Sequence, residues 1–130
     1  MPKKIGQRNT QQRQTIFEII KDAQGPLTVN EILVKADAKK LQIGIATIYR
    51  TIKLLLENKD ISQVVLPDGQ SRYETSRQAD HHHHHLHCNE CGKVIDVHKC
   101  CEHLHASEVE GHLVHRHEIT LFGVCKDCRR

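Results

Sequence analysis

Two pairs of cysteines near the end of the chain restrict its fold more than any other feature. Cys88 and Cys91 form one Cys-x-x-Cys pair, and Cys125 and Cys128 form another. Two intervening residues let both sulfurs of a pair bind one tetrahedral ion, while backbone amides of the turn hydrogen-bond the sulfurs. Four thiolates saturate such an ion, so we predict structural Zn²⁺. The ion would hold the last strand against the first hairpin of this region, and its loss should unfold the region.

The rest of the sequence favours metal binding by these cysteines over disulfide formation. The chain starts Met1-Pro2-Lys3-Lys4, without the apolar run of a secretory signal, and no stretch of about 18 apolar residues could span a membrane. We therefore expect a cytoplasmic protein with no membrane partner, in a reducing setting where paired cysteines usually bind metal. A redox dithiol is the alternative for either pair alone.

Histidine, cysteine and charge are distributed unevenly along the chain. All 12 histidines and all 6 cysteines follow residue 76. Residues 1–76 carry 12 Lys and Arg against 8 Asp and Glu, a balance of +4, and residues 77–130 carry 7 against 8, a balance of −1. This split suggests that the basic residues 1–76 meet a polyanion and that the ligand-rich residues 77–130 form a metal-binding domain. Aromatic residues make up only 3%, so the core must be aliphatic and modest. We therefore expect bound metal or a partner subunit to add stability.

Helical periodicity marks three helices in the first half. The first is predicted over residues 10–23, with Thr10 as N-cap, and the second begins at Thr28, which forms a capping box with Glu31. The third runs over residues 46–57. Its apolar stripe, which should face inward, consists of Ile45, Ile48, Ile52 and Leu55. The residues that should face outward are Tyr49, Arg50 and Lys53.

A hairpin follows these helices. Residues 61–66 and 71–75 are predicted to be strands joined by a Pro-Asp-Gly-Gln turn, and residues 76–80 a linker. Three helices followed by a hairpin indicate an α+β winged helix. In the second half we expect strands over 85–88, 94–97 and 117–124 and a short helix over 101–110, which together make a small α/β domain.

A run of five histidines, residues 81–85, can supply two metal sites. In an extended strand, alternation sends His83 and His85 to one face and His82 and His84 to the other. The first predicted site combines His83 and His85 with Glu74 and Asp96. The second combines His82 and His84 with His103 and His117, and Glu102 or His105 are alternatives to His103. Nitrogen and oxygen ligands suit Fe²⁺, Mn²⁺ or Zn²⁺. A solvated polar stretch is the plain alternative.

The outward face of the third helix is a candidate for DNA recognition. It carries Thr47, Tyr49, Arg50 and Lys53. Arginine can read guanine edges, tyrosine can contact a thymine methyl or a phosphate, and lysine binds phosphate. A merely solvated face is the alternative. Cys100 and Cys101 are adjacent, so they rarely share an ion, and their role stays open.

The chain resembles the ferric uptake regulator family along nearly its whole length. The matching segments are Arg8-Asn-Thr-Gln-Gln-Arg13, Gly44-Ile-Ala-Thr-Ile-Tyr-Arg50, His81–Cys91 with Gly92-Lys-Val-Ile-Asp96, and Phe122-Gly-Val-Cys-Lys-Asp-Cys128. The resemblance implies a homodimeric repressor that binds a palindromic DNA operator and controls metal-uptake genes. Residues 1–76 would be its winged-helix DNA-binding domain and residues 77–130 its metal-binding dimerisation domain. It implies DNA contacts by Tyr49 and Arg50 and extends the DNA-binding set to Arg13. It also implies structural zinc on the four paired cysteines, a regulatory ion between the two domains at the first predicted site, and a further ion at the second. It implies no small organic substrate.

Two departures from the family pattern bear on the regulatory ion. Residues 24–28 lack the histidine that many iron and peroxide sensors place there, and Thr75 and Ser76 stand where zinc sensors tend to use cysteine. The hard carboxylates Glu74 and Asp96 favour Fe²⁺, with Zn²⁺ or Mn²⁺ as alternatives. A zinc uptake regulator or a peroxide sensor is the nearest alternative function. A metalloenzyme and a metal buffer that does not bind DNA are less favoured hypotheses. We expect no catalytic residues.

Overall fold

The structure is a computed structural model that describes residues 5–76, 84–98 and 108–129, with side chains described from Thr10 onwards. The chain divides into two compact units, residues 1–81 and 82–130. The boundary that the sequence indicates after residue 76 stays a prediction, because residues 77–83 lie outside the described ranges. Within those ranges, none of the helices combines the length and apolarity needed to cross a membrane.

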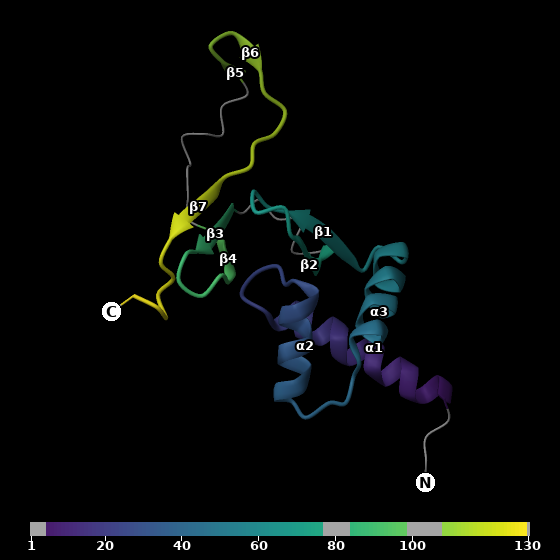
Figure 1. Cartoon of the computed structure of the whole chain (residues 1–130). Helices are drawn as coiled ribbons and strands as arrows, with labels where there is room; N and C mark the ends of the chain where they lie inside the picture. Colours follow the sequence, from purple (N-terminus) through teal and green to yellow (C-terminus); the bar gives the residue numbers. More distant parts are fainter. Residues whose placement is uncertain (1–4, 77–83, 99–107, 130) are drawn as a thin grey trace. The chain divides into compact units, whose positions relative to one another are not determined.

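The first unit contains three helices and a hairpin, in the order predicted for a winged helix (Figure 1). The elements are α1 (Ile5–Asp22), α2 (Val29–Ala38), α3 (Ile45–Glu57), β1 (Ile61–Val65) and β2 (Ser71–Thr75). β1 and β2 pair antiparallel, from Ile61 opposite Thr75 to Val65 opposite Ser71. Leu27, ahead of α2, exchanges two backbone hydrogen bonds with Tyr73 of β2, which ties the hairpin to the helices.

The core of this unit is aliphatic, as the composition predicts. Ile16 and Ile20 of α1, Ile32 of α2 and Ile48 of α3 are almost fully buried, and they pack together with Tyr73 of β2. Burial of a large aliphatic side chain contributes roughly 1.5–3 kcal/mol. Burial of these four side chains therefore helps to hold the three helices together.

Two helix starts show where local patterns are decisive and where they are not. The predicted capping box is confirmed: Thr28 Oγ1 accepts from the Glu31 backbone N–H, and Glu31 Oε1 accepts from the Thr28 N–H. The predicted N-cap Thr10 is wrong, because α1 begins at Ile5 and Thr10 lies inside it. The preceding Gln and Arg residues are good helix formers, so the helix continues past a possible cap.

One predicted core position of α3 is also wrong. Ile48, Ile52 and Leu55 are buried, whereas Ile45 is 43% exposed. Periodicity gives the direction of a side chain around a helix, but it does not say whether a neighbouring element reaches far enough to cover it. Ile45 is the first residue of α3, next to the N-cap Gly44. The first turn of α3 therefore presents an apolar side chain to solvent.

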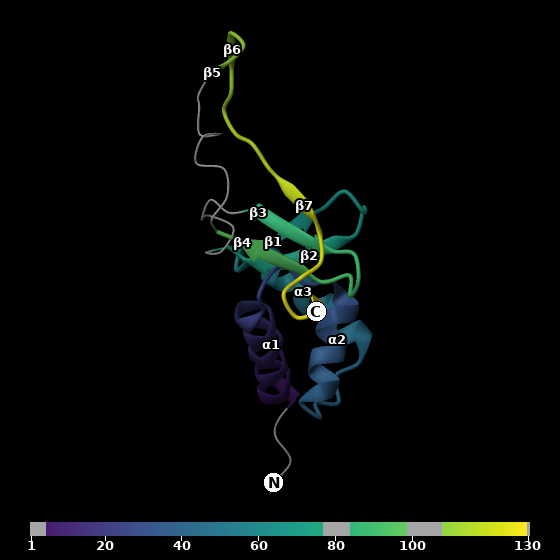
Figure 2. The same cartoon turned by 90° about the vertical axis from the view of Figure 1, so that its left-hand side faces the viewer.

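The second unit has a three-stranded sheet with the order β4-β3-β7 (Figure 2). β3 (His84–Cys88) pairs antiparallel with β4 (Val94–Val97) and parallel with β7 (Thr120–Gly123). Because parallel strands end at the same edge of a sheet, the chain segments that follow β3 and β7 begin side by side. Asn89, just after β3, donates its N–H to the Gly123 carbonyl at 2.7 Å.

The structure corrects two predictions in this unit. Residues 108–110 are not helical, because β5 (Glu108–Val109) and β6 (His112–Leu113) form a short hairpin. Glu110 and Gly111 at its turn have φ values of 50° and 84°, the left-handed conformations that a two-residue hairpin turn requires. Residues 101–107 lie outside the described ranges. The strand predicted over 117–124 is confirmed only as the shorter β7.

Candidate metal centres and DNA-facing helix

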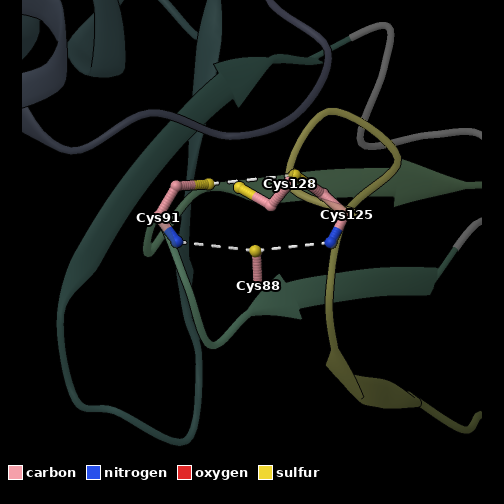
Figure 3. A group of neighbouring side chains, drawn as sticks. All are labelled: Cys88, Cys91, Cys125 and Cys128. Carbon is pink, nitrogen blue, oxygen red and sulfur yellow. Dashed lines mark hydrogen bonds between the residues drawn. The ribbon is translucent and has the colours of Figure 1, made fainter. Parts of the chain in front are cut away.

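The four paired cysteines come together at one edge of the second unit (Figure 3). Cys88 ends β3, Cys91 lies in the turn toward β4, and Cys125 and Cys128 follow β7. All four sulfurs lie within 4.8 Å of one another, and the sulfurs of Cys91 and Cys125 are 3.9 Å apart. A zinc–sulfur distance of about 2.3 Å implies an edge of about 3.8 Å for a tetrahedron of sulfurs. The donor set and its spacing therefore fit Zn²⁺.

Backbone amides are directed at the sulfur of Cys88. The N–H groups of Cys125 and Cys91 donate to it at 3.3 and 3.5 Å, and Cys88 is fully buried. Chiefly the Cys125 N–H, followed by the Cys91 N–H, lowers the pKa of the Cys88 thiol to about 6. The centre therefore holds a preformed thiolate at neutral pH, the ionised form that binds a metal.

Cys128 behaves in the opposite way in the metal-free centre. Its thiol donates toward the Cys125 sulfur, which with burial raises the pKa of Cys128 to about 12. An arriving cation must displace this proton.

A lysine and an aspartate near the four cysteines form an ion pair. Lys93 Nζ lies 3.3 Å from Asp127 Oδ2, and this hydrogen bond raises the pKa of Lys93.

The residues predicted for the first histidine and carboxylate site are described to different extents. His85 on β3 lies directly opposite Asp96 on β4, and its Nε2 is 3.4 Å from Asp96 Oδ1. Both side chains are mostly buried, with exposures of 13% and 10%. Glu74, on β2 of the first unit opposite Ser62, is buried. His83 lies outside the described residues.

The second predicted site is described for two of its residues. The rings of His84 on β3 and His117, in the segment before β7, lie 5.2 Å apart at an angle of 34°. The Ile119 N–H donates to Nδ1 of His84 at 3.3 Å, which orients that ring. His82 and His103, with the alternatives Glu102 and His105, lie outside the described residues, as do Cys100 and Cys101.

The candidate DNA-binding face of α3 is presented to solvent. Tyr49 is 56% exposed, and Arg50 and Lys53 are exposed as well. Arg50 donates to Thr47 Oγ1 at 3.1 Å, which holds the guanidinium along the helix surface. Arg13 of α1 lines a polar hollow together with Thr47 and Arg50, so these three of the five predicted residues lie together on the first unit.

Sequence reasoning missed several contacts around these residues. Arg72 makes a two-pronged ion pair with Asp68 in the wing turn, at 3.0 and 2.9 Å. Lys93 and Asp127 pair across the two cysteine knuckles. Both acidic residues lie in turns that the sequence does identify, so a search for basic residues near those turns could have found them.

Comparison with known proteins decides the family. The model of the ferric uptake regulator family matches residues 4–122. The chain belongs to this family. It is 32% identical to the ferric uptake regulation protein of Bacillus subtilis (strain 168), over 91% of this chain and 82% of that protein. It is 30% identical to the peroxide-responsive repressor PerR of Staphylococcus epidermidis (strain ATCC 12228 / FDA PCI 1200), over 98% of this chain and 85% of that protein.

A solved structure of another protein is similar to this chain in its fold as well as its sequence. A zinc-bound manganese uptake regulator has a TM-score of 0.71 and 33% identity, with 88% of this chain and 87% of that one covered. The α+β class, with its N-terminal winged helix and C-terminal domain, is confirmed by this family membership. The protein is a metal-responsive, DNA-binding transcriptional regulator and not an enzyme, so the metalloenzyme hypothesis is wrong.

Proposed function

We propose that the protein is a cytoplasmic, metal-dependent repressor that binds a palindromic DNA operator as a homodimer and controls metal-uptake genes. The observation that carries the proposal is the mostly buried pair of His85 and Asp96, in a chain whose other unit presents Tyr49 and Arg50 to solvent. An imidazole beside a carboxylate, both largely shielded from solvent, offers a nitrogen and an oxygen to a divalent cation. The exposed helix face offers groups that contact bases and phosphates.

Four cysteines, Cys88, Cys91, Cys125 and Cys128, would hold the structural Zn²⁺. A centre of four thiolates leaves no open position, so the ion would stabilise the second unit without sensing exchangeable metal. It would join β3 to the segment after β7. Support comes from the mutual distances of the sulfurs and from the two N–H groups directed at Cys88.

The regulatory ion would be bound by Glu74, His83, His85 and Asp96. Glu74 precedes the predicted linker and the other three follow it, so one ion held by all four would restrain the two units. An ion that binds the restrained arrangement better than the unrestrained one shifts the population toward it. The second set, His82, His84, His103 and His117, would hold a further ion inside the second unit.

Fe²⁺ is the regulatory ion that we favour. Two carboxylates in the first set supply hard oxygen ligands, and no cysteine stands at Thr75 or Ser76 to favour zinc. Zn²⁺ and Mn²⁺ are the alternatives, with zinc uptake regulation or peroxide sensing as the corresponding functions. The relatives are named for iron uptake, peroxide response and manganese uptake, so similarity supports a metal sensor without choosing its ion.

An ion-by-ion DNA-binding assay tests this function. Protein retaining its zinc but freed of other metals is titrated with a library of double-stranded DNA at fixed salt, without oxygen, in the presence of Fe²⁺, Mn²⁺ or added Zn²⁺. We expect enrichment of inverted repeats with half-sites about 34 Å, or one helical turn, apart, strongest with Fe²⁺ and with two chains per site. If the enrichment of inverted repeats is the same with and without each ion, the proposal is overturned. If it depends on Zn²⁺ or Mn²⁺ but not on Fe²⁺, the choice of iron is overturned.

A further inference from the structure

Lys93 and Asp127 belong to the two different cysteine knuckles of the four-cysteine centre. Lys93 lies two residues after Cys91, and Asp127 lies between Cys125 and Cys128. Their side chains meet at 3.3 Å, 34 residues apart in sequence. The backbone of Lys93 belongs to the same arrangement, because its carbonyl accepts the N–H of Cys88 at 3.0 Å. One residue thus contacts the first cysteine through its backbone and the second knuckle through its side chain.

The negative charge of the zinc-loaded cysteines makes the position of the Lys93 ammonium important. Four thiolates around Zn²⁺ carry a net charge of −2, and Asp127 adds another negative charge within the second knuckle. The ammonium of Lys93 is held there by the carboxylate, and the side chains of Lys93 and Asp127 are 37% and 60% exposed. Exposed charges more than about 10 Å apart are largely screened at ordinary salt, whereas Lys93 lies two residues from Cys91 and its ammonium is held at the second knuckle by Asp127.

We propose that Lys93 is a positioning residue of the four-cysteine centre: oriented by Asp127, it couples the two knuckles and offsets the negative charge of the zinc-loaded thiolates. The inference rests on the proposed structural zinc. Outer residues that hydrogen-bond or balance metal ligands typically change metal affinity 10–100-fold when replaced. Lys93 therefore controls how slowly the ion leaves.

Lys126 provides a matched control. It carries the same charge, lies inside the second knuckle next to Cys125, and is exposed. Replacing either lysine by glutamine removes one positive charge from the same neighbourhood. Only Lys93 also loses the contact that spans the two knuckles, so a difference between the variants reports position and not overall charge.

The experiment measures zinc transfer from the intact, zinc-loaded protein to an excess of a coloured chelator, at low and at high salt. We expect Lys93→Gln to release zinc about tenfold faster than the unmodified protein at low salt, and Lys93→Arg and Lys126→Gln to release it within about twofold. Asp127→Asn should speed release less than Lys93→Gln, because it also removes a negative charge. High salt should narrow the differences.

The outcomes separate this inference from the proposed zinc itself. If metal analysis finds no zinc in the unmodified protein, the structural zinc fails, and the role of Lys93 fails with it. If zinc is present but Lys93→Gln releases it no faster than Lys126→Gln, the role of Lys93 is overturned while the zinc stands. Release by Asp127→Asn as fast as by Lys93→Gln, unchanged by salt, would overturn charge compensation.

Discussion

The backbone N–H of Cys125 donates to the sulfur of Cys88 at 3.3 Å, although the two residues are 37 positions apart. This contact depends on the parallel pairing of β3 with β7, which ends both strands at the same edge. The sheet therefore brings the two cysteine knuckles together, and a bound ion would in turn hold the outer strand. The fold and a bound ion would therefore stabilise each other in the second unit.

Loss of one ligand in this centre should unfold the second unit selectively. Cys88→Ser removes the sulfur that accepts two backbone N–H groups, and zinc binding supplies folding free energy in small domains of this kind. We expect zinc content near zero and loss of dispersed amide signals for residues 84–98 and 108–129 in a heteronuclear NMR spectrum, with the signals of α1–α3 retained. His112→Ala, on the exposed β6, serves as the control. Retention of zinc and of a folded sheet by Cys88→Ser would show that the centre is not structural.

Zinc affinity should rise with pH. Binding needs four thiolates, but the pKa of Cys128 is raised to about 12 in the metal-free centre, so at neutral pH its proton must leave when zinc binds. The pKa of Cys88 is lowered to about 6, so below that pH a further proton must be displaced. The logarithm of affinity should therefore increase with pH, and more steeply below pH 6 than just above it. Competition with a chelator of known affinity measures this slope, and a pH-independent affinity would contradict it.

Two isoleucines three residues apart in α3 should differ in their effect on stability. Ile48 is fully buried in the first unit, so Ile48→Ala should lower the free energy of unfolding by about 2–5 kcal/mol. Ile45 is 43% exposed, so Ile45→Ala should change it by about 0.5 kcal/mol or less. Urea unfolding followed by circular dichroism measures both. Equal losses for the two variants would mean that Ile45 is covered.

The exposed face of α3 should be required for DNA binding but not for metal binding. Tyr49→Ala combined with Arg50→Ala removes two exposed side chains that support no core contact. We expect loss of operator binding with unchanged zinc content and unchanged uptake of the regulatory ion. Fluorescence anisotropy with labelled DNA, alongside metal analysis, measures the two properties. The exposed Lys35→Ala on α2 is the control, and unaltered DNA affinity of the double variant would favour a metal buffer.

Much of the fold can be predicted from short-range patterns. The capping box of Thr28 and Glu31, the hairpin turn at Gly69 and the two cysteine knuckles all follow from residues within a few positions of one another. Such contacts depend on local backbone geometry, which the sequence encodes directly. The Glu110-Gly111 turn is also a local feature, although from the sequence we predict a helix there instead of the hairpin of β5 and β6.

Other features depend on tertiary neighbours that periodicity does not describe. The exposure of Ile45, the parallel register of β3 with β7, and the pairing of Lys93 with Asp127 join residues through elements distant in sequence. The same holds for the metal sites. Alternation along β3 separates His84 from His85, but only the β4 register places Asp96 opposite His85.

The most direct test measures the operator affinity of zinc-loaded protein alone and with Fe²⁺, Mn²⁺ or added Zn²⁺, at fixed salt and without oxygen, for three forms of the chain: unmodified, Asp96→Ala and His115→Ala. His115 is exposed and belongs to neither predicted site. We predict that Fe²⁺ raises the affinity of the unmodified protein and of His115→Ala by about 5–150-fold and leaves Asp96→Ala unchanged. An equal response of Asp96→Ala, or no response of the unmodified protein to any of the three ions, would contradict the central claim that metal bound near His85 and Asp96 controls DNA binding.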